Sequence, residues 1–177
     1  MAGWLEFARS LKGGGVPARM ASRNGELESL QRVNSYLNRV RFLSDQEHWG
    51  AEDYWASPAE TVSSDGGDCE DFAIAKYFLL KELGIPNERL RITYVMALRL
   101  QQAHMVLAYY SRAGDEPLVL DNIDDRVLPS SQRRDLLPVY SFNDDDVQLA
   151  RGGRRENPLQ IRAWRELLDK LDREATL

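Results

Sequence analysis

One continuous segment, GGDCEDFAIAKYFLLKELGIP (66–86), constrains the fold more than any other part of the chain. After Asp68 its residues are apolar on most helical faces, and a helix of this kind has to be buried. The Asp68 carboxylate can accept hydrogen bonds from the free amides of a first helical turn, and Gly84 followed by Pro86 ends the helix. The sequence therefore predicts a buried helix that begins at Cys69.

The patterns on either side of this helix predict a mixed fold. Apolar residues at steps of three and four indicate a helix, and short runs rich in Val, Ile, Leu and Tyr indicate strands. The expected elements are, in order, an amphipathic helix (25–42), a structured loop with a short helix (44–64), the buried helix, three strands (90–98, 104–110 and 117–122), a polar, proline-containing stretch (125–146), and a C-terminal helix (158–171).

This order of elements predicts the fold class. Short polar connections between the three strands favour antiparallel pairing. Helices, then consecutive strands, then a helix are typical of an α+β protein. A chain of 177 residues suits one domain. We therefore expect a single domain over 1–177, with a flexible N-terminal segment (1–24) and a variable C-terminal helix (152–177).

The composition excludes several classes of function. The chain has 23 basic and 28 acidic residues, a net charge of −5, which disfavours generic binding to nucleic acid. A single cysteine excludes an internal disulfide and a CxxC motif, and two histidines leave little material for a histidine-rich metal site. No apolar run approaches the roughly 20 residues of a membrane span. The first residues show no recognisable export signal.

Three residues are candidates for nucleophilic catalysis. Cys69 would lie in the first turn of the buried helix, where free amides and the helix dipole stabilise a thiolate and the oxyanion of an acyl intermediate. His104 begins the second predicted strand and Asp121 ends the third. The order Cys, His, Asp supplies a nucleophile, a base and an orienting carboxylate. Each residue taken alone also fits a purely structural role, and only the joint pattern favours catalysis.

The surroundings of Cys69 are unusually acidic for a thiol enzyme. Asp65, Asp68, Glu70 and Asp71 lie within a few residues of Cys69, and carboxylates destabilise a neighbouring thiolate. A bound divalent cation would offset them. Carboxylate oxygens without nearby histidine or further thiol ligands suit calcium, and magnesium less well. The alternative is that these acids only cap the helix and face solvent.

Several long segments of the sequence resemble those of a known family. Matching segments run in order from VRFLSDQEHWGAEDYWASPAE through the cysteine segment, RITYV, QAHMVLAYY and EPLVLDNI to RRDLLPVYSFN, and the similarity covers about 34–143. The chain is similar to the bacterial transglutaminase-like cysteine proteinases, and within them to the LapG-type periplasmic proteases. The resemblance implies a papain-like, transglutaminase-like fold in which a helical N-terminal part packs on an antiparallel sheet.

The resemblance also implies an activity and its residues. Cys69 is carried over as nucleophile, His104 as general base and acid, and Asp121 as orienter, with Asp68 and Glu70 as ligands of calcium. Asp71 is a further candidate ligand.

Partners and location follow from the same resemblance. Family members are periplasmic and cleave the N-terminal retention region of a large surface adhesin, commonly at a dialanine site, which releases the adhesin and disperses the biofilm. An inner-membrane receptor for cyclic di-GMP controls them by binding them through its periplasmic domain. We therefore expect a periplasmic protein whose export signal has been removed, with no nucleic-acid partner and no insertion into the membrane.

Several alternatives stay open at the level of sequence. A transglutaminase-type acyl transferase would use the same triad, with an amine in place of water. A binding module with a vestigial triad and a zinc site built from Cys69, His104 and Asp121 are further alternatives. The candidates for the second oxyanion donor are Trp55 and Tyr54, although packing in the core or wall of the site explains these aromatic residues more readily.

Overall fold

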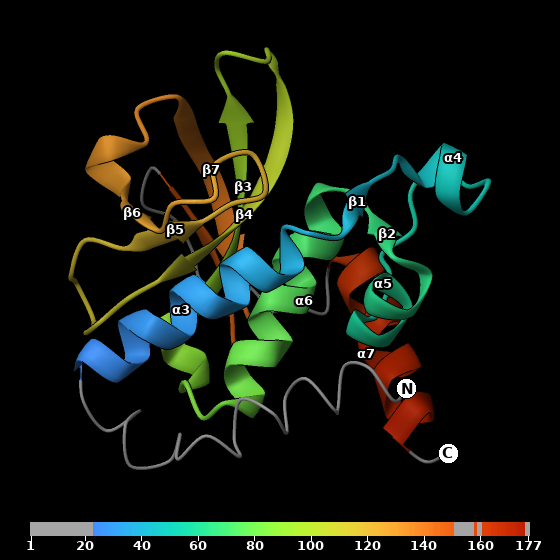
Figure 1. The fold of residues 1–177 in the computed structure, drawn as a ribbon, viewed down its shortest axis with the longest axis horizontal. Coiled ribbons are helices and arrows are strands. Elements are labelled where there is room, and N and C mark those ends of the chain that lie inside the picture. Colours follow the sequence, from blue (N-terminus) through green and yellow to red (C-terminus); the bar gives the residue numbers. More distant parts are fainter. Residues whose placement is uncertain (1–22, 151–157, 159–160, 176–177) are drawn as a thin grey trace.

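The computed structural model describes residues 23–150, 158 and 161–175, so most of the expected N-terminal segment and part of the expected C-terminal region lie outside the described residues. Helices and an antiparallel sheet make up the fold (Figure 1). The helices are α3 (Arg23–Leu37), α4 (Asp45–His48), α5 (Pro58–Ser64), α6 (Cys69–Glu82) and α7 (Arg162–Ala175), with 3-10 turns η1 (Asn87–Arg89) and η2 (Ser130–Gln132). The strands are β1 (Arg41–Phe42), β2 (Gly66–Gly67), β3 (Leu90–Ala97), β4 (Gln102–Tyr109), β5 (Leu118–Leu120), β6 (Leu128–Pro129), β7 (Leu136–Phe142) and β8 (Val147–Leu149).

The main sheet has six strands in the order β6-β5-β4-β3-β7-β8, and every neighbouring pair is antiparallel. The predicted antiparallel pairing is therefore confirmed. In β4, His104 pairs with Val95 of β3, and further along the strand Leu107 pairs with Leu120 of β5. The start of β4 and the end of β5 consequently lie side by side, because antiparallel neighbours run in opposite directions.

The core lies between the sheet and the helices. Helix α6 packs on β3 and β4, and α3 packs on α6 (Figure 1). Nine of the fourteen residues of α6 are buried, which confirms the predicted buried helix. Its start and end also match the prediction, since Asp68 is the N-cap, Leu83 the C-cap, and Gly84 has a φ of +95°.

Helix α7 is part of this core. Trp164 is fully buried, and its ring lies 5.2 Å from that of Phe142 and 5.8 Å from that of Tyr77. The predicted C-terminal helix thus forms, although it begins at Arg162 rather than at Pro158. Neither α7 nor any other helix in the described part of the chain combines the length and the apolar character needed to cross a bilayer.

Strand β7 was not predicted from the sequence. Residues 125–146 read as polar and proline-containing, yet β7 pairs with β3 along most of its length. Pro138 pairs with Val95 where the register shifts, and Val139 is the extra residue of this irregularity. A proline cannot donate a hydrogen bond in a ladder, so it is tolerated at such a bulge. The bulge also breaks the alternation that identifies a strand in sequence.

The two glycines before Cys69 form a short strand. Gly66 and Gly67 form β2, which pairs in parallel with β1. A Cβ atom at Gly66 would lie 2.2 Å from the His48 ring, and one at Gly67 would lie 2.9 Å from the Asp71 side chain. Only glycine permits this close approach, which brings α4 and β2 together beside the start of α6.

Candidate active site

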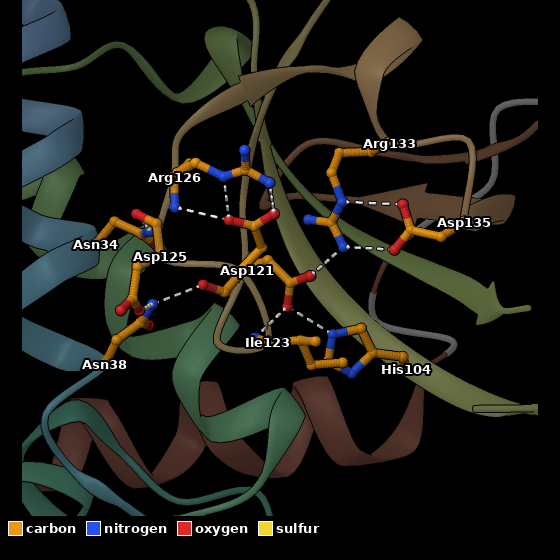
Figure 2. A network of polar contacts seen from close by, with 10 residues as sticks. Asn34, Asn38, His104, Asp121, Ile123, Asp125, Arg126, Arg133 and Asp135 are labelled. Carbon is orange, nitrogen blue, oxygen red and sulfur yellow. Dashed lines mark hydrogen bonds and ion pairs between the residues drawn. The ribbon is translucent and has the colours of Figure 1, made fainter. Parts of the chain in front are cut away.

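His104 and Asp121 form a buried hydrogen-bonded pair. The Nε2 atom of His104 lies 2.7 Å from Oδ1 of Asp121 (Figure 2), and both side chains are almost fully buried. His104 is the third residue of β4, and Asp121 directly follows β5. The predicted placement of these two residues on adjacent strands is therefore what the structure shows. Because Asp121 occupies Nε2, the other ring nitrogen, Nδ1, is left for a nucleophile.

The Asp121 carboxylate accepts hydrogen bonds on both oxygens. Oδ1 accepts from the backbone N–H of Ile123 at 3.1 Å as well as from His104, and Oδ2 accepts from Nη2 of Arg133 at 2.7 Å (Figure 2). Burial by itself would raise the pKa of Asp121, but the hydrogen bonds from His104, Ile123 and Arg133 outweigh it, so the pKa lies below its ordinary value. Asp121 is therefore ionised and can orient and stabilise an imidazolium.

Cys69 is the first residue of α6 and a half-buried free thiol. Its Sγ lies 3.0 Å from Oε2 of Glu70, and the backbone N–H of Met105 is a further hydrogen-bond donor to it. Since Met105 follows His104 on β4, the sulfur lies against the strand that carries the imidazole. The first N–H groups of α6 have no partner within the helix and are available to an oxyanion.

The charge around Cys69 opposes the thiolate. Burial and the Glu70 carboxylate raise the pKa of the Cys69 thiol far above its ordinary value, with a smaller contribution from Asp68, whereas the Met105 N–H lowers it. The protonated thiol donates a hydrogen bond to Oε2 of Glu70. A cation beside these carboxylates would remove most of the opposing field. The sequence-based expectation that the acids work against the nucleophile is thus reproduced by the geometry.

The acids form a larger cluster than the sequence indicated. Among the residues that the structure describes, three overlapping groups have ligand atoms within 4.8 Å of one another: Asp68, Cys69 and Glu70; Asp45, Asp53 and Glu70; and Asp45, Asp68 and Asp71. Asp45 starts α4, and Asp53 lies in the loop before α5. The structure therefore brings the three predicted ligands together and adds two more from upstream of β2.

Some carboxylate oxygens of this cluster accept hydrogen bonds from backbone N–H groups, and others have no hydrogen-bond partner. The N–H of Tyr54 donates to Oδ2 of Asp45 at 2.6 Å, and the N–H of Ala56 donates to Oδ1 of Asp71 at 2.8 Å. Among the described residues, Oδ1 of Asp45 and Oδ1 of Asp68 are buried without a hydrogen-bond partner. Buried carboxylate oxygens are costly unless they are paired or bind a cation, so the residues present fit a hard divalent ion.

The pKa values of these carboxyls lead to a test. Burial, with the charge of Glu70, raises the pKa of Asp71 to about 7 and also raises that of Asp68. Folded protein then holds protons that the unfolded chain releases, so stability present at low pH is lost as pH rises from about 4 toward 7. We expect the Tm of the EGTA-treated protein to fall by several degrees between about pH 5.5 and 8, since 1 kcal/mol corresponds to about 2–4 °C in a domain of this size.

Asp71→Asn is the matched variant for this measurement. The amide cannot ionise, so differential scanning fluorimetry is expected to show a weaker fall in its Tm over the same pH range. A Tm of the metal-free wild-type protein that stays level or rises between these pH values would contradict the assignment.

The two aromatic residues predicted as oxyanion donors are engaged elsewhere in this structure. The Tyr54 hydroxyl donates to Oε1 of Glu60 at 2.7 Å, and its ring lies 4.0 Å from Nζ of Lys170. The Trp55 ring stacks on that of Phe142, with centroids 6.0 Å apart, and its side chain hydrogen-bonds Asp53. Both residues line the wall near the acidic cluster, and an oxyanion role for either stays a prediction.

Sequence reasoning missed several residues around the triad. Arg133 contacts Asp121, and Asn38, in the turn directly after α3, donates to the Asp121 carbonyl oxygen at 2.7 Å (Figure 2). Lys76 of α6 is buried, and burial lowers its pKa to about 7 against the opposing charges of Asp121 and Asp125. A lysine inside an otherwise apolar helix is a visible signal. Arg133 carries none because it stands in a polar segment, and Asn38 carries none because a polar residue is ordinary on an amphipathic helix.

Known proteins resemble this arrangement. The family model described as "Bacterial transglutaminase-like cysteine proteinase BTLCP" matches residues 7–135. Calcium-bound LapG of Legionella pneumophila is 45% identical with a TM-score of 0.72, over 81% of this chain and 78% of that chain. EGTA-treated LapG of the same organism is 35% identical with a TM-score of 0.75, over 94% and 96%. A comparison with curated proteins finds no match.

These findings confirm the expected family, the expected fold class and the expected kind of enzyme, a cysteine protease. They agree with the geometry, in which an antiparallel sheet aligns an imidazole and a carboxylate beside a thiol at a helix start. The chain belongs to the bacterial transglutaminase-like cysteine proteinases.

Proposed function

We propose that this cysteine protease is a calcium-dependent endopeptidase that cleaves the periplasmic N-terminal region of a large surface adhesin. One observation supports calcium dependence above the others: a cluster of five carboxylates adjoins the nucleophile through Asp68 and Glu70, in a chain 45% identical to a LapG solved with calcium. The charge of a calcium ion held by Asp45, Asp68 and Asp71, with Glu70 and Asp53 beside it, would offset the carboxylates that destabilise the Cys69 thiolate.

The reaction follows from the triad. Nδ1 of His104 takes the proton of Cys69, since Nε2 is held by Asp121, and the thiolate attacks a peptide carbonyl. The free amides at the start of α6 stabilise the tetrahedral oxyanion. The imidazolium then protonates the leaving amine. Water, with His104 as base, hydrolyses the thioester and releases Cys69.

The biological setting belongs to the same proposal. Release of the adhesin would disperse a biofilm, and the periplasmic domain of an inner-membrane cyclic di-GMP receptor would hold the enzyme away from its substrate. The support is the identity of 35–45% to LapG over most of both chains. Addition of the purified receptor domain is expected to inhibit cleavage, and unchanged cleavage would contradict this part of the proposal.

Incubation with the N-terminal region of a candidate adhesin, with calcium or with EGTA, tests the proposal. Intact-mass measurement is expected to show two fragments whose masses add up to the substrate plus one water, in calcium only. A substrate in which the dialanine is replaced serves as control. Equal cleavage in EGTA would contradict calcium dependence. Incorporation of a labelled amine in place of water would favour the acyl transferase.

A further inference from the structure

Arg133 contacts the carboxylate of the triad but has no part in the reaction as described. It caps η2 and is almost fully buried. Its Nη2 donates to Oδ2 of Asp121 at 2.7 Å and to Oδ2 of Asp135 at 3.0 Å, and its Nε donates to Oδ1 of Asp135 at 3.1 Å (Figure 2). One guanidinium is thus shared between a catalytic carboxylate and a second carboxylate.

The contact with Arg133 provides a donor for the carboxylate oxygen of Asp121 that His104 does not reach. His104 and the backbone N–H of Ile123 both hydrogen-bond Oδ1 of Asp121, but neither contacts Oδ2. A buried carboxylate oxygen without a donor would favour rotation of the carboxylate or its protonation. Either change would weaken the hydrogen bond to Nε2. Arg133 supplies both the donor and a positive charge at this oxygen.

The guanidinium is itself held in place. Asp135 binds it with both oxygens, a planar and directional arrangement. The backbone of Asp135 is fixed in turn, because its carbonyl oxygen accepts from the N–H of Leu98 at 2.8 Å, next to the end of β3. Arg133 is therefore pre-organised by the sheet before any substrate arrives.

We propose that Arg133 is a positioning residue for the protease reaction: it holds the Asp121 carboxylate ionised and oriented so that Oδ1 faces Nε2 of His104. The other charged groups that face Asp121 are His104 on β4 and Lys76 on α6. Lys76 contributes charge, while Arg133 contributes a directed hydrogen bond to the oxygen opposite His104. The inference rests on the cysteine-protease chemistry and not on the identity of the substrate.

A matched control is available in the same network. Arg126 binds both oxygens of Asp124 through Nε and Nη2, much as Arg133 binds Asp135. Its side chain is 73% exposed, and its contacts do not include His104 or Asp121. Arg126→Met therefore removes the same kind of ion pair without touching the catalytic carboxylate.

The first experiment needs no substrate. The chain has two histidines, so a protein labelled with ¹⁵N-histidine gives few imidazole signals. The Nε2–H signal of His104, identified by its loss in His104→Gln, is expected to shift or broaden in Arg133→Met and to stay in place in Arg126→Met. A signal that does not move in Arg133→Met would overturn the proposal, whatever the enzyme cleaves.

The second experiment measures turnover. Arg133→Met is expected to lower kcat about 10- to 100-fold, a loss typical of removing an outer hydrogen-bond partner that supports a functional site, with KM unchanged. Arg133→Lys, which keeps the charge, is expected to recover part of the loss. The acid limb of the kcat/KM profile should move to higher pH in Arg133→Met, because Asp121 then protonates more readily. A kcat within about twofold of wild type would overturn the proposal.

A double variant separates positioning from general loss of structure. If Arg133 acts through Asp121, Arg133→Met should lower kcat little further in an Asp121→Asn background, since coupled residues are not additive. An equal loss in both backgrounds would overturn the proposal. If circular dichroism shows that Arg133→Met does not fold, Arg133→Lys and Asp135→Asn decide the question through the same signal of His104, which should again shift.

Discussion

Replacement of Cys69 by alanine is expected to abolish peptide cleavage, with a loss in kcat of about four orders of magnitude or more. No other thiol exists in the chain, and the sulfur lies at the start of α6 against the strand that carries His104. Without this sulfur no thioester can form. The free amides at the start of α6 can still stabilise an oxyanion, but direct attack by water remains far slower than the reaction of the intact enzyme. Single-turnover assays with the adhesin segment, followed by mass spectrometry of the products, measure the effect.

The fold should survive this substitution. Cys69 is half-buried and contributes one thiol contact to Glu70, so the Tm is expected to change by no more than a few degrees. Ser63→Ala, on the exposed side of α5, is the control and should retain full activity. Turnover by Cys69→Ala near the wild-type rate would end the cysteine-protease assignment.

The remaining triad members are expected to show graded losses. Asp121→Asn keeps the shape of the side chain but removes its charge, and about a 10²- to 10⁴-fold loss in kcat is expected. His104→Ala should approach the loss seen for Cys69→Ala, because the other histidine of the chain, His48, lies in α4 and not on the strand beside Cys69. An Asp121→Asn variant with wild-type kcat would show that the buried pair is structural only.

The sequence predicted the catalytic core well because its signals are local. The apolar run after Cys69 can form only a buried helix, and α6 begins and ends where the capping residues indicate. His104 and Asp121 could be placed because each stands at the end of a run of strand-forming residues. Antiparallel neighbours then bring them together without further information. Strand order thus places the two residues on neighbouring strands, where their side chains make the 2.7 Å contact.

The missed features depend on contacts between distant segments. Asp45 reaches the acidic cluster only because β1 pairs with β2, a contact between two-residue strands that no periodicity reveals. Arg133 reaches Asp121 because β6 and η2 fold back beside β5. Strand β7 could not be recognised in the sequence, because Pro138 and the adjacent bulge interrupt the alternation of residues that identifies a strand. In each case the role of a polar or irregular segment depends on its tertiary contacts, which local secondary-structure propensity does not reveal.

Removal of calcium is expected to inactivate the wild-type enzyme and to lower its Tm. With calcium at about 100 times its Kd, binding to the folded state alone contributes about 2.7 kcal/mol, which corresponds to about 5–10 °C in a domain of this size. Titration with calcium and with EGTA, followed by thermal unfolding and cleavage assays, measures both effects. Magnesium at the same concentration is the ionic control, and it is expected to restore little of either.

Asp45→Asn is the sharpest variant for this question, because Asp45 is far from Cys69 in sequence yet shares the cluster with Asp68 and Asp71. Loss of one carboxylate should weaken calcium binding, so more calcium is needed for the same activity, while activity at saturating calcium recovers. Asp65→Asn is the matched control, since Asp65 is exposed, pairs with Arg41 and belongs to none of the ligand groups found in the described residues. If Asp45→Asn and wild type respond to calcium identically, the ion does not bind at this cluster. Calcium dependence would then need another physical origin than neutralising the acids around the thiolate.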